Sequence, residues 1–181
     1  MLICCLPVMI VANLLSQKPD NNSILVDSGY VNVNGGKLFY EIAGKGENIV
    51  LLHDGMVNCR IWDEQFPLLA KNYRVLRYDR RGYGKSSDPQ TQYSHIDDLN
   101  QVFIQLKVEK AVIFGMSSGG RLAIDFTLTY PEKVKGLVLV GAVVSGFGYT
   151  NHMNTRGGTF NRSEYPDPEK LIKYFIAKFR Q

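Results

Sequence analysis

Cysteine is scarce in this sequence of 181 residues, which contains only three. Cys4, Cys5 and Cys59 are odd in number and lack the spacing of a metal-binding motif. A disulfide framework and a zinc site are therefore both excluded, and the cysteines do not indicate a redox compartment. Because no other motif requires a metal or another cofactor, we expect the protein to use neither.

Charge of one sign is not concentrated anywhere in the chain. The sequence holds 21 Lys and Arg against 17 Asp and Glu, a formal net charge of +4, and its cations are scattered. This distribution argues against a nucleic-acid partner, which requires basic residues gathered on one face. Internal repeats and low-complexity tracts are absent as well, and 45% apolar and 21% charged residues are ordinary for a globular protein. The length suits one domain with a sizeable core.

The apolar N-terminal stretch lacks the length of a membrane span. Leu2 to Leu15 carry no charge, but so short a run does not comfortably cross about 30 Å of hydrocarbon. The stretch suits the core of a signal peptide, yet no cation precedes it and the first is Lys18. We predict that residues 1–26 are a signal-like or disordered leader without a stable membrane span. Export or membrane association through this leader and a cytoplasmic location both stay open.

From Asp27 onward, apolar runs and turn residues alternate regularly. Asn34-Gly35-Gly36 separates two alternating runs and predicts a hairpin with a tight glycine turn. Further strands are predicted over residues 49–53, 73–79, 111–115 and 136–141, and helices over 60–71, 94–106 and 117–130. Strands that alternate with helices indicate an α/β fold, here a mostly parallel sheet with an N-terminal antiparallel hairpin. From residue 149 the chain becomes polar and Gly-rich before an amphipathic ending.

One serine stands where a catalytic nucleophile is expected. The segment GMSSG, residues 115–119, fits G-x-S-x-G and lies between a predicted strand and a predicted helix. Ser117 is the central residue, because Ser118 as the centre would need glycine at Met116. Ser118 would instead give its backbone N–H to an oxyanion at the positive end of the helix dipole. A glycine-serine turn without chemistry is the alternative.

A second turn offers another oxyanion donor. The segment LLHDGM, residues 51–56, ends a buried strand and turns at Asp54-Gly55. In folds with a G-x-S-x-G turn, the loop in this position supplies the second N–H of the oxyanion hole. We assign that N–H to Gly55. His53 closes the buried strand, and we interpret it as a structural histidine rather than a catalytic one.

A phosphate-binding loop is the rival motif. Gly84-Lys85-Ser86 matches the end of G-x-x-x-x-G-K-[ST], but the pattern requires glycine where this chain has Asp79. A carboxylate at that place would repel a phosphate. Ser87-Asp88-Pro89 also interrupts the helix whose N-terminus the phosphate needs. We therefore reject nucleotide binding.

The segments LLHDG, YDRRGYGKSS, GMSSGG and YPEKVKGLVLVG together resemble the α/β-hydrolase superfamily, in its serine-nucleophile type and its N-terminal portion. The resemblance covers roughly residues 28–145. It implies that Ser117 is the nucleophile and that Gly55 and Ser118 carry the oxyanion-hole amides. It also implies a structural loop beside the site, made of Asp79, Arg81, Gly82, Gly84 and Ser86. Asp54 departs from the family, which usually has glycine there, and it brings a carboxylate near the oxyanion hole.

The resemblance implies a small-molecule substrate and acyl chemistry. The superfamily's epoxide hydrolases and haloalkane dehalogenases have aspartate at the position of Ser117, so serine favours attack on an ester- or amide-like bond through an acyl-enzyme. Met56, Trp62 and Met116 are candidates for the pocket wall, although apolar residues near a sheet edge more often belong to the core.

The rest of a catalytic triad is not apparent. The order in this fold is serine, acid, histidine, and the only histidine after Ser117 is His152, in a flexible-looking run. The other polar candidates are interpreted as solvated, capping or surface groups: His95, Asp125, Glu164 and Asp167. We therefore predict that residues 27–148 are the N-terminal part of the hydrolase core and 149–181 the start of a cap.

This chain by itself is expected to be inactive, because it lacks the acid and the histidine of the catalytic triad. A six-stranded sheet without the last strands of the fold would also expose one unpaired edge, which favours aggregation. Two other interpretations stay open: a non-catalytic binding protein with this fold, and a half-domain completed by another chain. The sequence does not indicate an oligomeric state.

Overall fold

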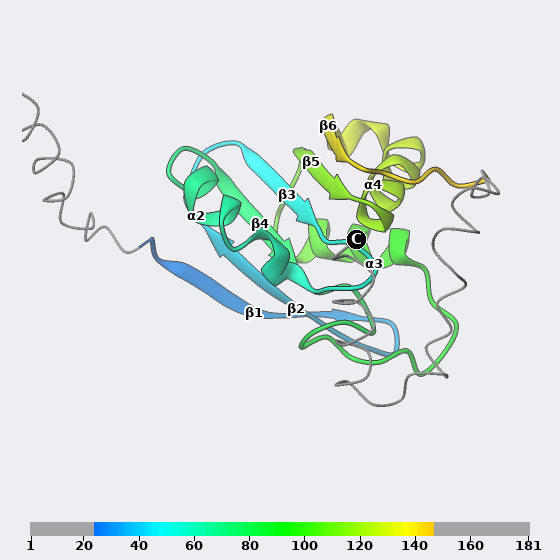
Figure 1. Cartoon of the computed structure of the whole chain (residues 1–181). Coiled ribbons are helices and arrows are strands. Elements are labelled where there is room, and N and C mark those ends of the chain that lie inside the picture. Colours follow the sequence, from blue (N-terminus) through cyan, green and yellow to red (C-terminus); the bar gives the residue numbers. More distant parts are fainter. Residues whose placement is uncertain (1–23, 147–181) are drawn as a thin grey trace, which may run out of the picture. The chain divides into compact units, whose positions relative to one another are not determined.

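The computed structural model describes residues 24–146, which form a six-stranded sheet in the order β1-β2-β4-β3-β5-β6 (Figure 1). The strands are β1 (Val26–Val33), β2 (Gly36–Ala43), β3 (Asn48–Leu52), β4 (Arg74–Tyr78), β5 (Ala111–Met116) and β6 (Val134–Val140). β1 pairs with β2 and β2 with β4 in antiparallel fashion, whereas β4, β3, β5 and β6 are parallel to one another. The predicted fold class is confirmed.

Several predictions fall outside the described residues. These are the leader over residues 1–23, the cap over 149–181, and the candidates His152, Glu164 and Asp167. β1 begins at Val26, which is the last residue of the predicted leader. Within residues 24–146, no helix is both long and apolar enough to cross a bilayer.

The N-terminal hairpin follows from its turn residues. Val33 pairs with Gly36, so Asn34 and Gly35 form a two-residue turn, as predicted. Gly35 has a φ of 73°, a backbone conformation that glycine adopts without a steric penalty.

Each central strand divides its side chains between two cores. Successive residues of a strand point to opposite faces, so Val50 and Leu52 of β3 join one apolar cluster while Ile49 and Leu51 join the other. The first cluster includes residues of α3 (His95–Gln105) and α4 (Ser118–Thr129). The second includes residues of η1 (Cys59–Trp62) and α2 (Gln65–Ala70), which lie on the other face of the sheet (Figure 1). Burial on both faces explains the continuous apolar runs of these strands.

The predicted helix over residues 60–71 is wrong in one respect. The structure has the 3₁₀ turn η1 and then the short helix α2, with Asp63 and Glu64 between them. Pro67 accounts for the division, because a helix that began at residue 60 would need an N–H in its interior that proline lacks. In α2 the proline lies in the first turn, where no N–H is required. The predicted last strand is also displaced: β6 begins at Val134, two residues before Gly136.

Candidate active site

Ser117 lies in a strained backbone conformation between β5 and α4. Its φ is 50° and its ψ is −114°, a region that residues with a side chain rarely adopt and that clusters at functional sites. The Ser117 N–H donates to the Val140 carbonyl at 2.9 Å, and the Ser117 carbonyl accepts from the Arg121 N–H at 3.1 Å. β6 and the first turn of α4 thus hold this backbone from both sides. Among the described residues, the half-buried Ser117 side chain has no hydrogen-bond partner.

Glycines flank Ser117 because other parts of the backbone pass close to it. A Cβ added to Gly115 would lie 2.6 Å from the Gly120 Cα. A Cβ added to Gly119 would lie 2.5 Å from the His53 carbonyl oxygen and 2.6 Å from that of Leu52. The first turn of α4 therefore touches the end of β3, which brings the serine turn against the loop that follows β3.

We expect Gly119→Ala to lower the free energy of unfolding by about 1–3 kcal/mol, as overpacking does. The new methyl group would meet backbone carbonyls, which cannot rotate away, and alanine's better helix propensity would offset only part of the cost. Urea unfolding measures the change. The matched control is Gly136→Ala, since a Cβ added to Gly136 in β6 would meet nothing within 4 Å. Equal losses in the two variants would contradict this account of the turn.

The loop after β3 brings Gly55 next to Ser118. A Cβ added to Gly55 would lie 2.9 Å from the Ser118 Oγ, and the Tyr83 hydroxyl donates to the Gly55 carbonyl at 2.9 Å. Ser118 is the first residue of α4, so its N–H has no acceptor within the helix and lies at the positive end of the helix dipole. The structure thus brings together all three predicted site residues, Ser117, Gly55 and Ser118.

The Asp54 carboxylate is used within its own turn. Its Oδ1 accepts a hydrogen bond from the Met56 N–H at 2.6 Å, a local bond typical of aspartate in turns. This bond gives the departure from the usual glycine a structural role in shaping the loop.

His53 is a buried structural residue. Its Nε2 accepts from the Arg80 N–H at 3.0 Å, so the proton lies on Nδ1, which is 2.6 Å from the Asp54 carbonyl oxygen. Burial, assisted by the charge of Arg80, lowers the pKa of His53 to about 4, so the ring is neutral near pH 7. With both ring nitrogens bonded to the backbone, His53 has no atom free to accept a proton from Ser117.

The other polar candidates within residues 24–146 have neighbours of their own. His95 begins α3, where burial lowers its pKa to about 4, and its ring lies edge-on to Tyr93 with 5.0 Å between centroids. The Asp125 carboxylate accepts from the Ser145 hydroxyl at 2.7 Å. Trp62 is buried in the second apolar cluster, together with residues of α2, whereas Met56 is exposed.

The loop after β4 is built around the Asp79 carboxylate. Its two oxygens accept from the N–H groups of Cys59 and Lys85, each at 2.8 Å. Gly84 has a φ of 52°, and a Cβ there would overlap this carboxylate. Because the Lys85 N–H is already bonded to a carboxylate, the loop is closed to phosphate. Further along the loop, Arg81 forms a bidentate ion pair with Asp98 of α3.

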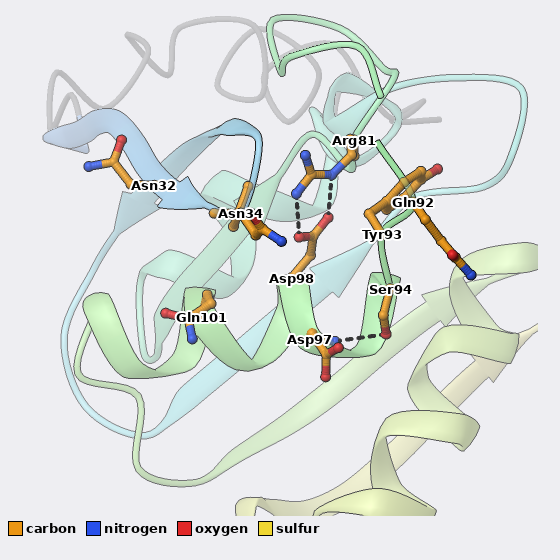
Figure 2. Close-up of a pocket in the computed structure, with 10 residues that line it drawn as sticks. Asn32, Asn34, Arg81, Gln92, Tyr93, Ser94, Asp97, Asp98 and Gln101 are labelled. Carbon is orange, nitrogen blue, oxygen red and sulfur yellow. Dashed lines mark hydrogen bonds and ion pairs between the residues drawn. The ribbon is translucent and has the colours of Figure 1, made fainter. Parts of the chain in front are cut away.

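A polar cavity of about 510 Å³ lies between the hairpin and the N-terminal half of α3. Figure 2 shows the Arg81–Asp98 pair in its wall, with Tyr93 and the amide side chains of Asn34 and Gln92 around it. None of the residues that line the cavity is a candidate nucleophile or oxyanion donor. We therefore place the candidate site at the turn around Ser117 and not in the cavity.

Sequence reasoning missed Arg80. The buried guanidinium contacts both the loop after β3 and the start of α4. Only the fold brings these segments together, and the sequence signal was limited to two adjacent arginines after a buried strand.

Comparison with known proteins gives one family. A family model described as alpha/beta hydrolase fold matches residues 48–179. The 2-hydroxy-6-oxo-6-(2'-aminophenyl)hexa-2,4-dienoic acid hydrolase of Metapseudomonas resinovorans is 31% identical over 120 residues, which are 62% of this chain and 41% of that protein. The 2-hydroxy-6-oxononadienedioate/2-hydroxy-6-oxononatrienedioate hydrolase of Klebsiella pneumoniae is 31% identical over 172 residues, 84% of this chain and 59% of that protein.

Among solved structures, bromoperoxidase from Bacillus anthracis matches with a TM-score of 0.60 and 33% identity, over 64% of this chain and 45% of that chain. The chain thus spans between 41% and 59% of the length of these three relatives.

Proposed function

The chain belongs to the alpha/beta hydrolase fold family, and from this premise we propose that it is a serine hydrolase that cleaves ester- or amide-like small molecules through an acyl-enzyme. The observation that carries the proposal is the strained backbone of Ser117, beside the backbone amides of Gly55 and Ser118. A backbone held out of its favoured region by its surroundings is characteristic of a residue positioned for chemistry.

In this mechanism the Ser117 Oγ attacks the carbonyl carbon of the substrate. A bond forms between Oγ and that carbon, while the Oγ proton passes to a general base. The carbonyl oxygen becomes an oxyanion that accepts hydrogen bonds from the N–H groups of Gly55 and Ser118. Collapse then breaks the bond to the leaving group, which takes the proton, and water hydrolyses the acyl-enzyme by the same steps.

The general base is to be sought outside residues 24–146. Within that range, His53 has both nitrogens bonded to the backbone, and no hydrogen bond joins His95, whose ring packs against Tyr93, to Ser117. The names of the two curated relatives support hydrolysis as the class of reaction, since both are hydrolases.

A fluorophosphonate probe tests the proposal, because it phosphonylates a serine that is both nucleophilic and next to an oxyanion hole. We expect the protein expressed from its complete gene to give one adduct, mapped by peptide mass spectrometry to Ser117. Ser118 is the internal control, since it is a serine in the same peptide. An adduct on Ser118, or none on either serine, would contradict the proposal, and absence of any adduct would favour a non-catalytic binding protein.

A further inference from the structure

Arg80 is a buried cation without an ionic partner among the described residues. The residue is 3% exposed, and no carboxylate in residues 24–146 forms an ion pair with it. The neighbouring Asp79 directs its carboxylate to two backbone amides instead. A buried charge without a partner is costly to the fold, so its presence calls for a reason beyond packing.

One nitrogen of this side chain joins the two segments of the candidate site. The Arg80 Nη2 donates to the Asp54 carbonyl and to the Ser118 Oγ, each at 2.9 Å. The first contact is to the loop after β3 and the second is to the first residue of α4. The two segments are far apart in the sequence. Arg80 contacts each of them next to a backbone amide that is assigned to the oxyanion, Gly55 in the first segment and Ser118 in the second.

The contact with Asp54 fixes the direction of the Gly55 N–H. The Asp54 carbonyl and the Gly55 N–H belong to one peptide group, which is planar and normally trans, so they point in opposite directions. His53 and Arg80 both lie at the carbonyl end of this peptide, at 2.6 Å and 2.9 Å from the oxygen. With its carbonyl bonded to them, the peptide presents its N–H away from Arg80. A cation at the carbonyl end also polarises the peptide and strengthens the N–H as a donor.

We propose that Arg80 is a positioning residue of the oxyanion hole: it orients the Asp54–Gly55 peptide, fixes the peptide relative to Ser118, and polarises the peptide from its carbonyl end so that the Gly55 N–H is a stronger donor to the oxyanion. The inference rests on the proposed function. Tyr83 completes the arrangement, because its ring lies 5.1 Å from the Arg80 guanidinium and its hydroxyl donates to the Gly55 carbonyl. Successive carbonyls of the loop are thus held by Arg80 and Tyr83.

The side chain can be removed without losing the bond to His53, because that bond comes from the Arg80 backbone N–H. Arg80→Met keeps an unbranched apolar side chain in place of the arginine stem and removes its charge and donors, and Arg80→Lys keeps the charge. The matched control is Arg77→Met, because Arg77 in β4 is also a buried arginine, 5% exposed, but pairs with Glu41 and Asp63. The probe is a fluorophosphonate, and its saturation kinetics give a maximal rate of phosphonylation, kinact, and an apparent affinity, KI.

We expect Arg80→Met to lower kinact about 10- to 100-fold with KI unchanged, somewhat less than the loss of a direct oxyanion donor. Arg80→Lys should give an intermediate kinact, since the ammonium group keeps the charge but sits on a shorter side chain and does not reach the position of Nη2. Arg77→Met should lower the melting temperature and leave kinact of the folded protein as in the wild type. If circular dichroism shows that Arg80→Met does not fold, the intermediate kinact of Arg80→Lys is the test.

An unchanged kinact in the Arg80 variants would overturn the inference while leaving the proposed function in place. A change confined to KI would also overturn it, and would make Arg80 a ligand-binding residue. Equal losses of kinact in Arg80→Met and Arg77→Met would reduce Arg80 to a stabilising role. Failure of the wild-type protein to react at Ser117 would instead reject the proposed function, and the inference with it.

Discussion

Ser117→Ala is expected to abolish ester hydrolysis by the protein expressed from its complete gene, with a loss in kcat on the order of 10⁶-fold. The substitution removes the only atom that forms the covalent bond in the proposed mechanism. The oxyanion amides of Gly55 and Ser118 belong to the backbone and stay in place, so a small residual rate over water, roughly 10³–10⁴, is expected to persist. Turnover of a nitrophenyl ester measures the loss.

The adjacent serine provides the comparison for this prediction. Ser118→Ala keeps the backbone N–H that the oxyanion uses and loses only the hydroxyl contacted by Arg80. It should therefore lose far less activity than Ser117→Ala. Circular dichroism and the melting temperature must show that both variants are folded. Unchanged turnover in Ser117→Ala would refute the assignment of the nucleophile.

Asp98→Ala is expected to lower the free energy of unfolding by about 3–5 kcal/mol, the usual cost of leaving one partner of a buried ion pair alone. Arg81 donates to both oxygens of this carboxylate, at 2.9 Å and 2.7 Å, and is only 1% exposed. Without Asp98, the charge of Arg81 would stay buried beneath the hairpin. Urea unfolding curves of the wild type and the variant, analysed with a common slope, measure the loss.

Two further variants separate the ion pair from packing. Arg81→Met combined with Asp98→Leu removes both charges and should restore most of the stability, because a buried pair is often replaced by apolar residues at little cost. Arg60→Met removes the partner of an exposed pair with Asp63 and should change stability little. If Asp98→Ala were as mild as Arg60→Met, the buried pair would contribute little to the fold.

Most of the fold could be predicted because each element carries a local signal. The turn at Asn34-Gly35 and the alternating runs beside it define the hairpin, and the continuous apolar run of β3 fits a strand with cores on both faces. Ser94, the first residue of the helix predicted over 94–106, accepts from the Asp97 N–H and caps the start of α3. These signals lie within a few residues of one another, and sequence reasoning is strongest at that range.

The rest depended on contacts between distant segments. The division of the predicted helix is the exception, because Pro67 is a local signal and the prediction rested on the apolar spacing of residues 60–71 alone. Arg80 had no local signal of its role, since its two partners lie 26 and 38 positions away in the chain. The polar cavity beside Asp98 likewise combines the hairpin with α3, and only the folded sheet brings these together.

If Ser117 is the nucleophile that we propose, its backbone conformation places stability and chemistry in conflict at one position. A φ of 50° is unfavourable for serine and easily reached by glycine, so the fold alone would be better served by a residue that cannot react. A library of variants selected only for resistance to heat would therefore tend to replace this serine early. Under the proposed function, directed evolution of this protein for thermal tolerance has to include turnover in its screen, because the most stable variants would lack the nucleophile.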